Sequence, residues 1–267
     1  MSASVSKNDP KVVAVTNQKG GVGKTTTTIN ISAALVELGK KVLIIDLDPQ
    51  GNASTGLGID HDQRGLTIYD VLLAETVISE AVLPTAMDGL HIIPSTVDLS
   101  SADIELIKTK FPSTALSMAF SGDQSLFEGY DFIFIDCPPS LSLLTVNAMV
   151  AANSVLIPLQ TEFFALEGLS QLMLSVREVR KSVNTELRFE GVVLTMFDRR
   201  NNLSQQVEKD ARDNLGELIF KTVIPRNVRV SEAPSHSMSV LSYEPKSRGA
   251  QAYRRLGKEF LKNNKDI

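Results

Sequence analysis

A glycine-rich turn between an apolar run and a helical pattern constrains this chain more than any other feature. Residues 12–15 predict a buried strand, and residues 25–38 carry apolar side chains at the three- and four-residue spacing of a helix. Glycines allow backbone amides to approach a phosphate chain closely, and amides at a helix N-terminus point at the anion. We therefore predict that the turn binds the phosphates of a nucleotide through Lys19, Gly20, Gly21, Val22, Gly23, Lys24, Thr25 and Thr26.

Three side chains of this turn have separate expected roles. Lys24 reaches the terminal phosphates as a point charge, and the hydroxyl of Thr25 is placed to ligate magnesium. The turn opens with Lys19 instead of a glycine, so two lysines five positions apart surround one phosphate site. The second lysine therefore needs a function of its own.

Carboxylates follow two further apolar runs. Residues 42–45 lead into Asp46 and Asp48, which a strand places on the same side, and residues 132–135 lead into Asp136. Open parallel sheets bind ligands at the carboxyl ends of their strands. Carboxylates beside a nucleotide can hold magnesium, orient the attacking water or accept its proton. The pattern predicts phosphoryl transfer to water.

These motifs resemble the deviant Walker A loop and Walker B strand of the ParA/MinD family of P-loop ATPases. The resemblance implies ATP and Mg²⁺ as cofactors and ATP hydrolysis as the activity. It implies that Lys19 reaches across a dimer interface to the nucleotide of the other subunit, and that Lys24 and Asp48 complete the catalytic set, with Asp48 positioning or activating water. Residues matching Asp46 and Asp136 belong, with Thr25, to the magnesium shell.

The C-terminal segments 224–236 and 243–250 resemble the chromosomal ParA (Soj) branch of that family. In that branch the ATP-bound dimer binds DNA without sequence preference, and a ParB-type centromere-binding protein stimulates hydrolysis. Arginines matching Arg200 and Arg229 carry much of the DNA contact, while Pro225 and Asn227 border the adenine. Both arginines lie far along the chain from the phosphate-site motifs, so we expect them to act independently of those motifs.

The charge distribution supports a polyanion partner. Residues 1–187 carry 12 basic and 21 acidic side chains, whereas residues 188–267 carry 15 and 10. A positive segment can attract a polyanion although the whole chain has a net charge of −4. Within it, Lys221, Lys246 and Arg248 join Arg200 and Arg229 as predicted DNA contacts.

The predicted fold is α/β, a mostly parallel twisted sheet flanked by helices. We expect a disordered lead-in over residues 1–10 and a single P-loop ATPase domain over 11–267. Further strands are predicted at 90–94, 132–135, 155–158 and 192–196, and helices at 95–108, 142–151 and 166–181. Residues 111–129 receive no assignment.

Composition excludes several classes of protein. No apolar run approaches the roughly 20 residues that span a bilayer, and the N-terminus lacks the apolar core of a secretory signal. We expect a cytoplasmic, nucleoid-associated protein without membrane binding. A nitrogenase iron protein needs two cluster-binding cysteines per subunit, whereas Cys137 is the single cysteine here.

Two related functions stay open. A MinD-type division regulator needs a terminal amphipathic helix, and residues 253–267 carry little apolar surface after Leu261. A ParA-like ATPase that positions another cargo on the nucleoid would use the same ATP and DNA chemistry with a different partner. The sequence does not distinguish that function from chromosome or plasmid segregation.

Overall fold

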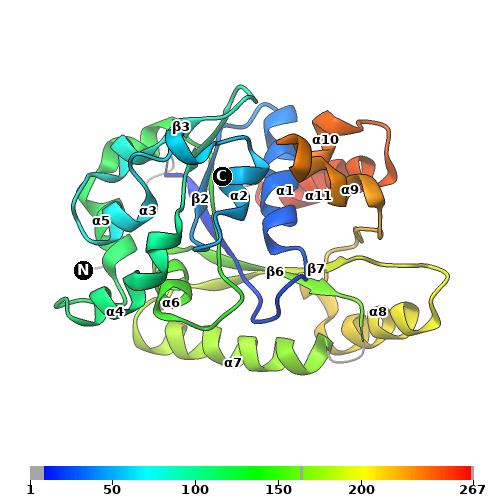
Figure 1. The fold of residues 1–267 in the computed structure, drawn as a ribbon. Coiled ribbons are helices and arrows are strands. Elements are labelled where there is room, and N and C mark those ends of the chain that lie inside the picture. Colours follow the sequence, from blue (N-terminus) through cyan, green and yellow to red (C-terminus); the bar gives the residue numbers. More distant parts are fainter. Residues whose placement is uncertain (1–8, 163–164, 266–267) are drawn as a thin grey trace.

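The computed structural model describes residues 9–162 and 165–265, which form a seven-stranded sheet flanked by helices (Figure 1). Its strand order is β3-β4-β2-β5-β1-β6-β7, and every neighbouring pair is parallel except β3 with β4. The predicted α/β class with a mostly parallel sheet is therefore confirmed. The strands are β1 (Lys11–Val15), β2 (Val42–Asp46), β3 (Leu83–Pro84), β4 (Leu90–Ile93), β5 (Phe132–Asp136), β6 (Ser154–Gln160) and β7 (Arg188–Thr195).

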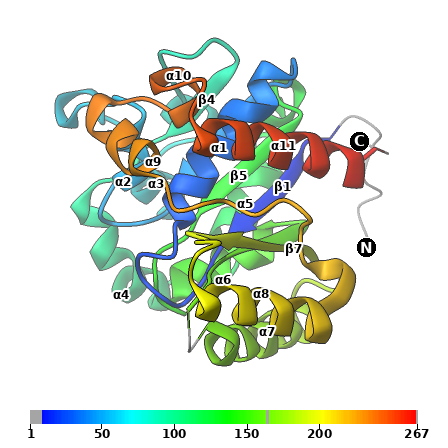
Figure 2. The same ribbon diagram turned by 90° about the vertical axis from the view of Figure 1, so that its right-hand side faces the viewer.

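Helices cover both faces of the sheet (Figure 2). One face packs against α1, α2, α9, α10 and α11, and the other against α3 to α8. Because both faces are covered, the central strands are continuous apolar runs, and every residue of β2 and β5 is buried. The helices are α1 (Lys24–Glu37), α2 (Asn52–Gly56), α3 (Ile68–Leu72), α4 (Ala102–Ile107), α5 (Ala115–Gly122), α6 (Leu143–Ala151), α7 (Ala165–Ser182), α8 (Asn202–Leu215), α9 (Val228–Glu232), α10 (Val240–Tyr243) and α11 (Arg248–Asn263).

The last helix, α11, lies along α1 and buries its apolar side. Tyr253, Leu256 and Phe260 are at most 1% exposed, and a Cβ on Gly257 would lie 2.9 Å from the Cβ of Ala34. Truncation of such a buried ring to alanine costs about 3–5 kcal/mol of stability. The apolar side of α11 thus belongs to the core. Within the described part of the chain, no helix has both the length and the apolar composition needed to cross a membrane.

The predicted elements agree with the structure where the pattern was strong. The helices at 25–38, 142–151 and 166–181 and most of the predicted strands occur within two residues of their expected positions, whereas β7 begins at Arg188, four residues before the predicted start at 192. The expected helix at 95–108 is a 3₁₀ helix (Val97–Ser101) followed by α4, and the unassigned residues 111–129 contain α5 and a 3₁₀ helix (Gln124–Gly129). Most of the predicted lead-in lies outside the described residues, and Asp9 and Pro10 form neither helix nor strand.

Candidate nucleotide site

The glycine-rich loop joins the carboxyl end of β1 to the start of α1. Gly21 and Gly23 adopt left-handed backbone conformations, with φ of 73° and 89°, which glycine reaches without steric cost. Gly23 is the N-cap of α1, and no side chain caps the helix. The first amides of α1 are therefore available to an anion, as the sequence predicts.

Hydrogen bonds from two neighbouring strands hold the loop in place. The side-chain amide of Asn17 donates to the carbonyl of Pro158 in β6 (2.8 Å), and its carbonyl oxygen accepts from the amide of Lys19 (3.0 Å). The hydroxyl of Thr195, at the end of β7, donates to the carbonyl of Val22 (2.8 Å). The contacts of Asn17 with Pro158 and of Thr195 with Val22 join residues more than 140 positions apart, so no local sequence pattern identified them.

Lys24 is almost fully buried within the loop. Its exposed fraction is 7%, and its Nζ donates to the carbonyl of Lys19 at 3.1 Å. Burial lowers the pKa of Lys24, whereas the carboxylates of Asp136 and Asp48 raise it. An ammonium ion with so little water around it is strongly stabilised by a negatively charged phosphate ligand.

Lys19 points away from Lys24 and is paired within its own chain. Its ammonium group forms an ion pair with Glu162, which follows β6, and 47% of its side chain is exposed. The structure therefore separates the two lysines of the loop into a buried cation and an exposed one.

Asp46 and Asp136 are directly opposite each other in the register of β2 and β5, and both are fully buried. Oδ1 of Asp136 accepts from the hydroxyl of Thr28 (3.2 Å), while Oδ2 has no hydrogen-bond partner among the described residues. Burial, with repulsion from Asp46, raises the pKa of Asp136 to about 8, and a hydrogen bond from Thr25 opposes this shift. An unpartnered carboxylate oxygen beside a threonine fits a Mg²⁺ site.

Both carboxylate oxygens of Asp46 accept hydrogen bonds within the protein. Its Oδ2 accepts from both the backbone amide (2.8 Å) and the hydroxyl (2.7 Å) of Ser54, and its Oδ1 accepts from the amide of Asp48 (3.3 Å). Burial raises the pKa of Asp46 to about 6 despite these bonds. Asp46 thereby closes the turn between β2 and α2. The sequence did not indicate Ser54.

Asp48 lies inside that turn, at the edge of the cavity beside the glycine-rich loop. It is 7% exposed, and its Oδ1 accepts from the amide of Gln50 (3.0 Å). The cavity has a volume of about 290 Å³. Its lining consists of Gly20, Gly21, Gly23, Lys24, Thr25, Thr26, Asp48, Gln50, Asn52, Pro139 and Met196.

A second cavity of about 180 Å³ continues the first, because both are lined by Gly23, Thr26 and Met196. Pro225 and Asn227, the residues predicted to border the adenine, line it together with Arg226 and the buried Tyr253. The two cavities together have backbone amides and a lysine at one end, and at the other apolar side chains such as Ile224, Pro225 and Val230 mixed with polar ones. Such a site accommodates a polyphosphate chain and a planar base.

Most of the predicted DNA-binding residues lie beside this second cavity. The end of β7 pairs with the segment before α9 through Phe197 and Pro225, and this pairing brings Asp198, the ion-pair partner of Arg200, close to Arg226. A Cβ on Gly249 would lie 2.3 Å from Cγ2 of Val230, so the start of α11 packs tightly on α9. The resulting basic rim consists of Arg200, Arg226, Arg229, Lys246 and Arg248, all exposed.

Lys221 is not part of the basic rim. Phe220 is hydrogen-bonded to Val192, five residues before Phe197 along the direction of β7. Five residues of strand correspond to about 16 Å. The structure thus places Lys221 away from Arg226 along the direction of β7. Arg200 and Arg229 lie far along the chain from the glycine-rich loop, but their segments lie beside the second cavity.

Proteins of known family resemble this chain over almost its whole length. Residues 10–189 match a sequence model described as an AAA domain. The chain is 52% identical to the chromosome partitioning protein ParA of Caulobacter vibrioides, over 98% of both chains. It is 49% identical to the sporulation initiation inhibitor protein Soj of Bacillus subtilis, over 95% of this chain and 99% of that one.

Solved structures show the same fold. A structure of cobyrinic acid a,c-diamide synthase from Mycobacterium smegmatis with bound ADP and magnesium is 36% identical, covers 96% of both chains and has a TM-score of 0.83. The cell division ATPase MinD of Pyrococcus furiosus is 28% identical over 94% of this chain and 98% of that one, with a TM-score of 0.78. The chain belongs to the ParA/Soj family of chromosome-partitioning P-loop ATPases.

Proposed function

We propose that this ATPase segregates chromosomes or plasmids by switching between an ATP-bound dimer on DNA and a free monomer. The observation that carries this proposal is the junction between the nucleotide cavity and the basic rim. Asn227 lines the cavity, and Arg229 follows it by two residues at the start of α9. Met196 lines both cavities, and Arg200 follows it by four. A change in the bound nucleotide therefore acts next to the DNA-binding residues.

The phosphate end of the site binds and polarises ATP. Amides of Gly20, Gly21, Val22 and Gly23, with those of Lys24, Thr25 and Thr26 at the start of α1, surround the phosphates, and the ammonium of Lys24 neutralises them. Thr25 and the free oxygen of Asp136 hold Mg²⁺, which supplies charge stabilisation at the transferred phosphoryl group. Pro225 and Asn227 border the adenine.

Asp48 acts on the hydrolytic water. Its carboxylate lies at the rim of the phosphate cavity and carries one hydrogen bond, from Gln50, which leaves its other oxygen for water. Asp46, whose oxygens accept hydrogen bonds from Ser54 and Asp48, would belong with Asp136 and Thr25 to the residues around Mg²⁺. Its contribution is to fix the turn that presents Asp48.

Lys19 makes dimerisation depend on ATP. Its exposed ammonium leaves Glu162 and reaches the phosphates bound by the other subunit. ATP favours the dimer over the monomer only through the extra contacts that it makes in the dimer. Hydrolysis of ATP removes those contacts. Dimerisation doubles the basic rim available to DNA phosphates, so hydrolysis is the release step.

The partner in this cycle is a ParB-type centromere-binding protein that stimulates hydrolysis, and the site of action is the nucleoid. A ParA-like ATPase for another cargo would differ in that partner alone. The first test is ATP binding and hydrolysis by wild type and Lys24→Ala, with Lys40→Ala as a control lysine that pairs with Asp131 outside the site. Loss of ATP binding only in Lys24→Ala supports the site, and micromolar ATP affinity in that variant overturns it.

A further inference from the structure

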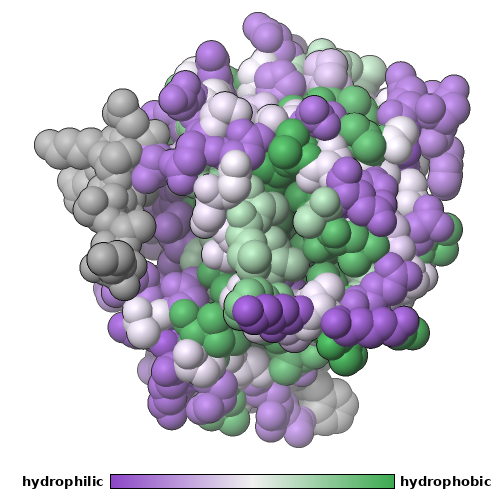
Figure 3. All heavy atoms as spheres, turned by 90° about the vertical axis from the view of Figure 1, so that its left-hand side faces the viewer, coloured by the Kyte–Doolittle hydropathy of each residue, from purple (hydrophilic) through white to green (hydrophobic). Residues whose placement is uncertain are grey.

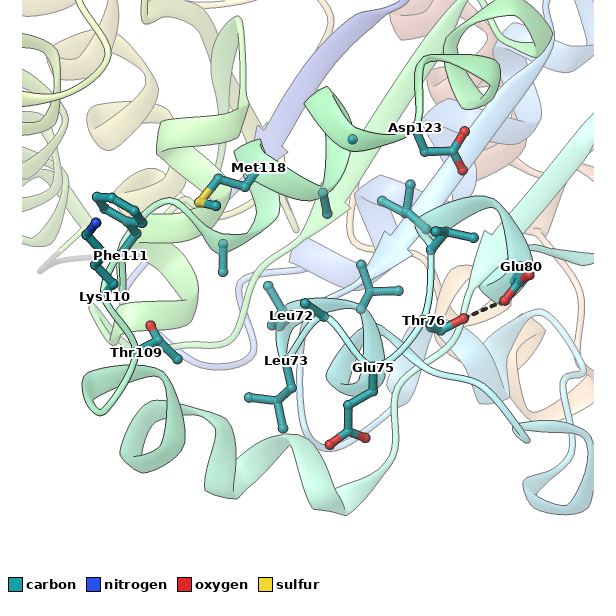
Figure 4. A pocket seen from close by; sticks show the side chains of 17 residues that line it. Leu72, Leu73, Glu75, Thr76, Glu80, Thr109, Lys110, Phe111, Met118 and Asp123 are labelled. Atoms are coloured by element: carbon teal, nitrogen blue, oxygen red, sulfur yellow. Dashed lines mark hydrogen bonds between the residues drawn. The ribbon is translucent and has the colours of Figure 1, made fainter.

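A large groove lies away from the nucleotide site, between α3 and α5. Its volume is about 710 Å³. Figure 4 shows Phe111 and Met118 on one side of it and Leu72 and Leu73 on the other. Phe111 and Met118 are 50% and 53% exposed. Figure 3 shows this face of the molecule, with hydrophobic residues around a hollow and hydrophilic residues at its border. Contiguous apolar surface of this kind marks a site of interaction.

The groove has a distinct charge at one end. Glu80 and Asp123 lie at that end, Glu75 lies on the same border, and Lys110 lies at the opposite end (Figure 4). Glu80 accepts a hydrogen bond from Thr76, and Asp123 accepts from Ser79 and Ser125. None of the three carboxylates forms an ion pair with a residue of the described segments. The groove therefore combines apolar walls with uncompensated negative charge.

We propose that this groove binds a short segment of the DNA-binding, ParB-type partner, with aliphatic side chains against Phe111 and Met118 and lysine or arginine side chains at Glu75, Glu80 and Asp123. The proposal rests on the proposed function, because it assigns a place to that partner. Charge complementarity selects this occupant. A protein that binds DNA carries basic segments, whereas DNA itself is repelled by this border.

The groove is connected to the catalytic turn by a short series of contacts. The amide of Ile68, at the start of α3, donates to the carbonyl of Pro94 (2.9 Å). The amide of the next residue, Ser95, donates to the hydroxyl of Ser54 (3.1 Å), which in turn donates to Asp46. A segment docked against α3 thus contacts the element that supports the turn holding Asp48.

The test measures binding of the purified ParB-type protein from the same organism to wild type and to groove variants. Met118→Glu and the double variant Glu75→Lys with Glu80→Lys change exposed side chains. Leu174→Glu, at 53% exposure on α7, and Glu178→Lys, with 74% of its side chain exposed there, are matched controls. We expect at least a tenfold loss of partner affinity in each groove variant, less than twofold in the controls, and unchanged basal ATPase activity and ATP-dependent DNA binding.

Partner-stimulated hydrolysis should fall in parallel with affinity, and wild-type partner affinity should weaken with salt. Partner binding by both groove variants at the wild-type level overturns the docking site and leaves the proposed function standing. A wild-type protein that binds DNA with ATP but does not bind the partner overturns both the docking site and the partner assignment. If the wild-type protein shows no ATP-dependent DNA binding, that result contradicts the proposed function itself.

Discussion

Ser54 donates two hydrogen bonds to one carboxylate oxygen of Asp46, from its backbone amide at 2.8 Å and from its hydroxyl at 2.7 Å. The other oxygen of Asp46 accepts from the amide of Asp48. The carboxylate therefore ties the start of α2 to Asp48, which lines the cavity beside the glycine-rich loop. The geometry of the catalytic turn depends on a serine that contributes nothing to the phosphate cavity itself.

Replacement of this serine tests its positioning role. We expect Ser54→Ala to lower kcat for ATP about tenfold with little change in KM, because Asp48 loses its orientation while the phosphate loop is intact. Loss of a buried hydrogen bond also costs about 1–3 kcal/mol of stability. Steady-state kinetics and thermal unfolding measure both effects. Ser32→Ala is the matched control, because the buried hydroxyl of Ser32 has no partner among the described residues. Equal kcat in the two variants would contradict the role.

The ion pair between Lys19 and Glu162 competes with the proposed role of Lys19 in the other subunit. Glu162→Gln should strengthen ATP-dependent dimerisation by at most about fivefold, since exposed ion pairs contribute about 0–1 kcal/mol. Lys19→Ala should bind nucleotide and fail to dimerise. Analytical ultracentrifugation with ATP and magnesium measures both effects. A weaker dimer in Glu162→Gln would show that the pair supports the interface.

The buried carboxyl of Asp136 predicts a dependence of stability on pH. Its folded pKa, about 8, lies above the ordinary value of 3.8, so the folded state binds more protons between these values. The free energy of unfolding therefore falls as pH rises from about 4 to 8. Without nucleotide or magnesium, Asp136→Asn should be more stable than wild type above pH 8, by at least the 1.36 kcal/mol that corresponds to about one pKa unit.

This advantage of Asp136→Asn should shrink as pH falls to 4. Thermal unfolding of both proteins across this range measures it. Equal melting temperatures of wild type and Asp136→Asn at pH 9 would show that ionisation of the Asp136 carboxyl does not destabilise the folded protein. Because repulsion from Asp46 contributes to the raised pKa of Asp136, the comparison measures the cost of ionising Asp136 beside Asp46.

Both arginines expected to contact DNA are paired within the chain. Arg200 lies 3.3 Å from Asp198, and Arg229 lies 2.7 Å from Glu232, and each carboxylate raises the pKa of its arginine. Arg200→Glu and Arg229→Glu should each weaken DNA binding about tenfold or more without altering ATP-dependent dimerisation. Asp198→Asn should strengthen DNA binding slightly by releasing Arg200. Arg177→Glu, on the exposed side of α7, is the control.

Fluorescence anisotropy with unrelated duplexes measures these affinities. Binding should be similar for all sequences and fall by orders of magnitude between about 50 and 200 mM salt if roughly 6–10 phosphates are covered. Wild-type binding by both charge-reversal variants, or strong selection of one sequence, would contradict the role of the basic rim.

The parts of the fold and site that could be predicted from sequence are those encoded by local patterns. Apolar strands that end in carboxylates and a turn rich in glycine identified Lys24, Asp48 and Asp136. Ser54, Asn17 and Thr195 escaped prediction because their partners lie distant in the chain or carry no spacing signal. Residues 111–129 were unassigned because α5 is short and only Leu116 and Phe120 of its eight residues are buried.

The position of Arg229 likewise could not be predicted from local sequence patterns. Its distance along the chain from the glycine-rich loop suggested independence from the nucleotide. The parallel pairing of Phe197 with Pro225 instead brings the segment that contains Arg229 to the second cavity. Such pairing depends on where β7 ends in the sheet, which the local sequence does not specify. Lys221, equally basic, precedes that pairing and lies elsewhere.

DNA binding by Asp48→Ala, compared in ATP with magnesium, in ADP and without nucleotide, tests the central claim most directly. The variant keeps the phosphate loop and loses the group that acts on water, so ATP should persist and hold the dimer on DNA. The account predicts tight, long-lived binding of unrelated duplexes in ATP alone and weak binding in the other two conditions. Equal DNA binding in all three conditions would contradict a switch driven by ATP.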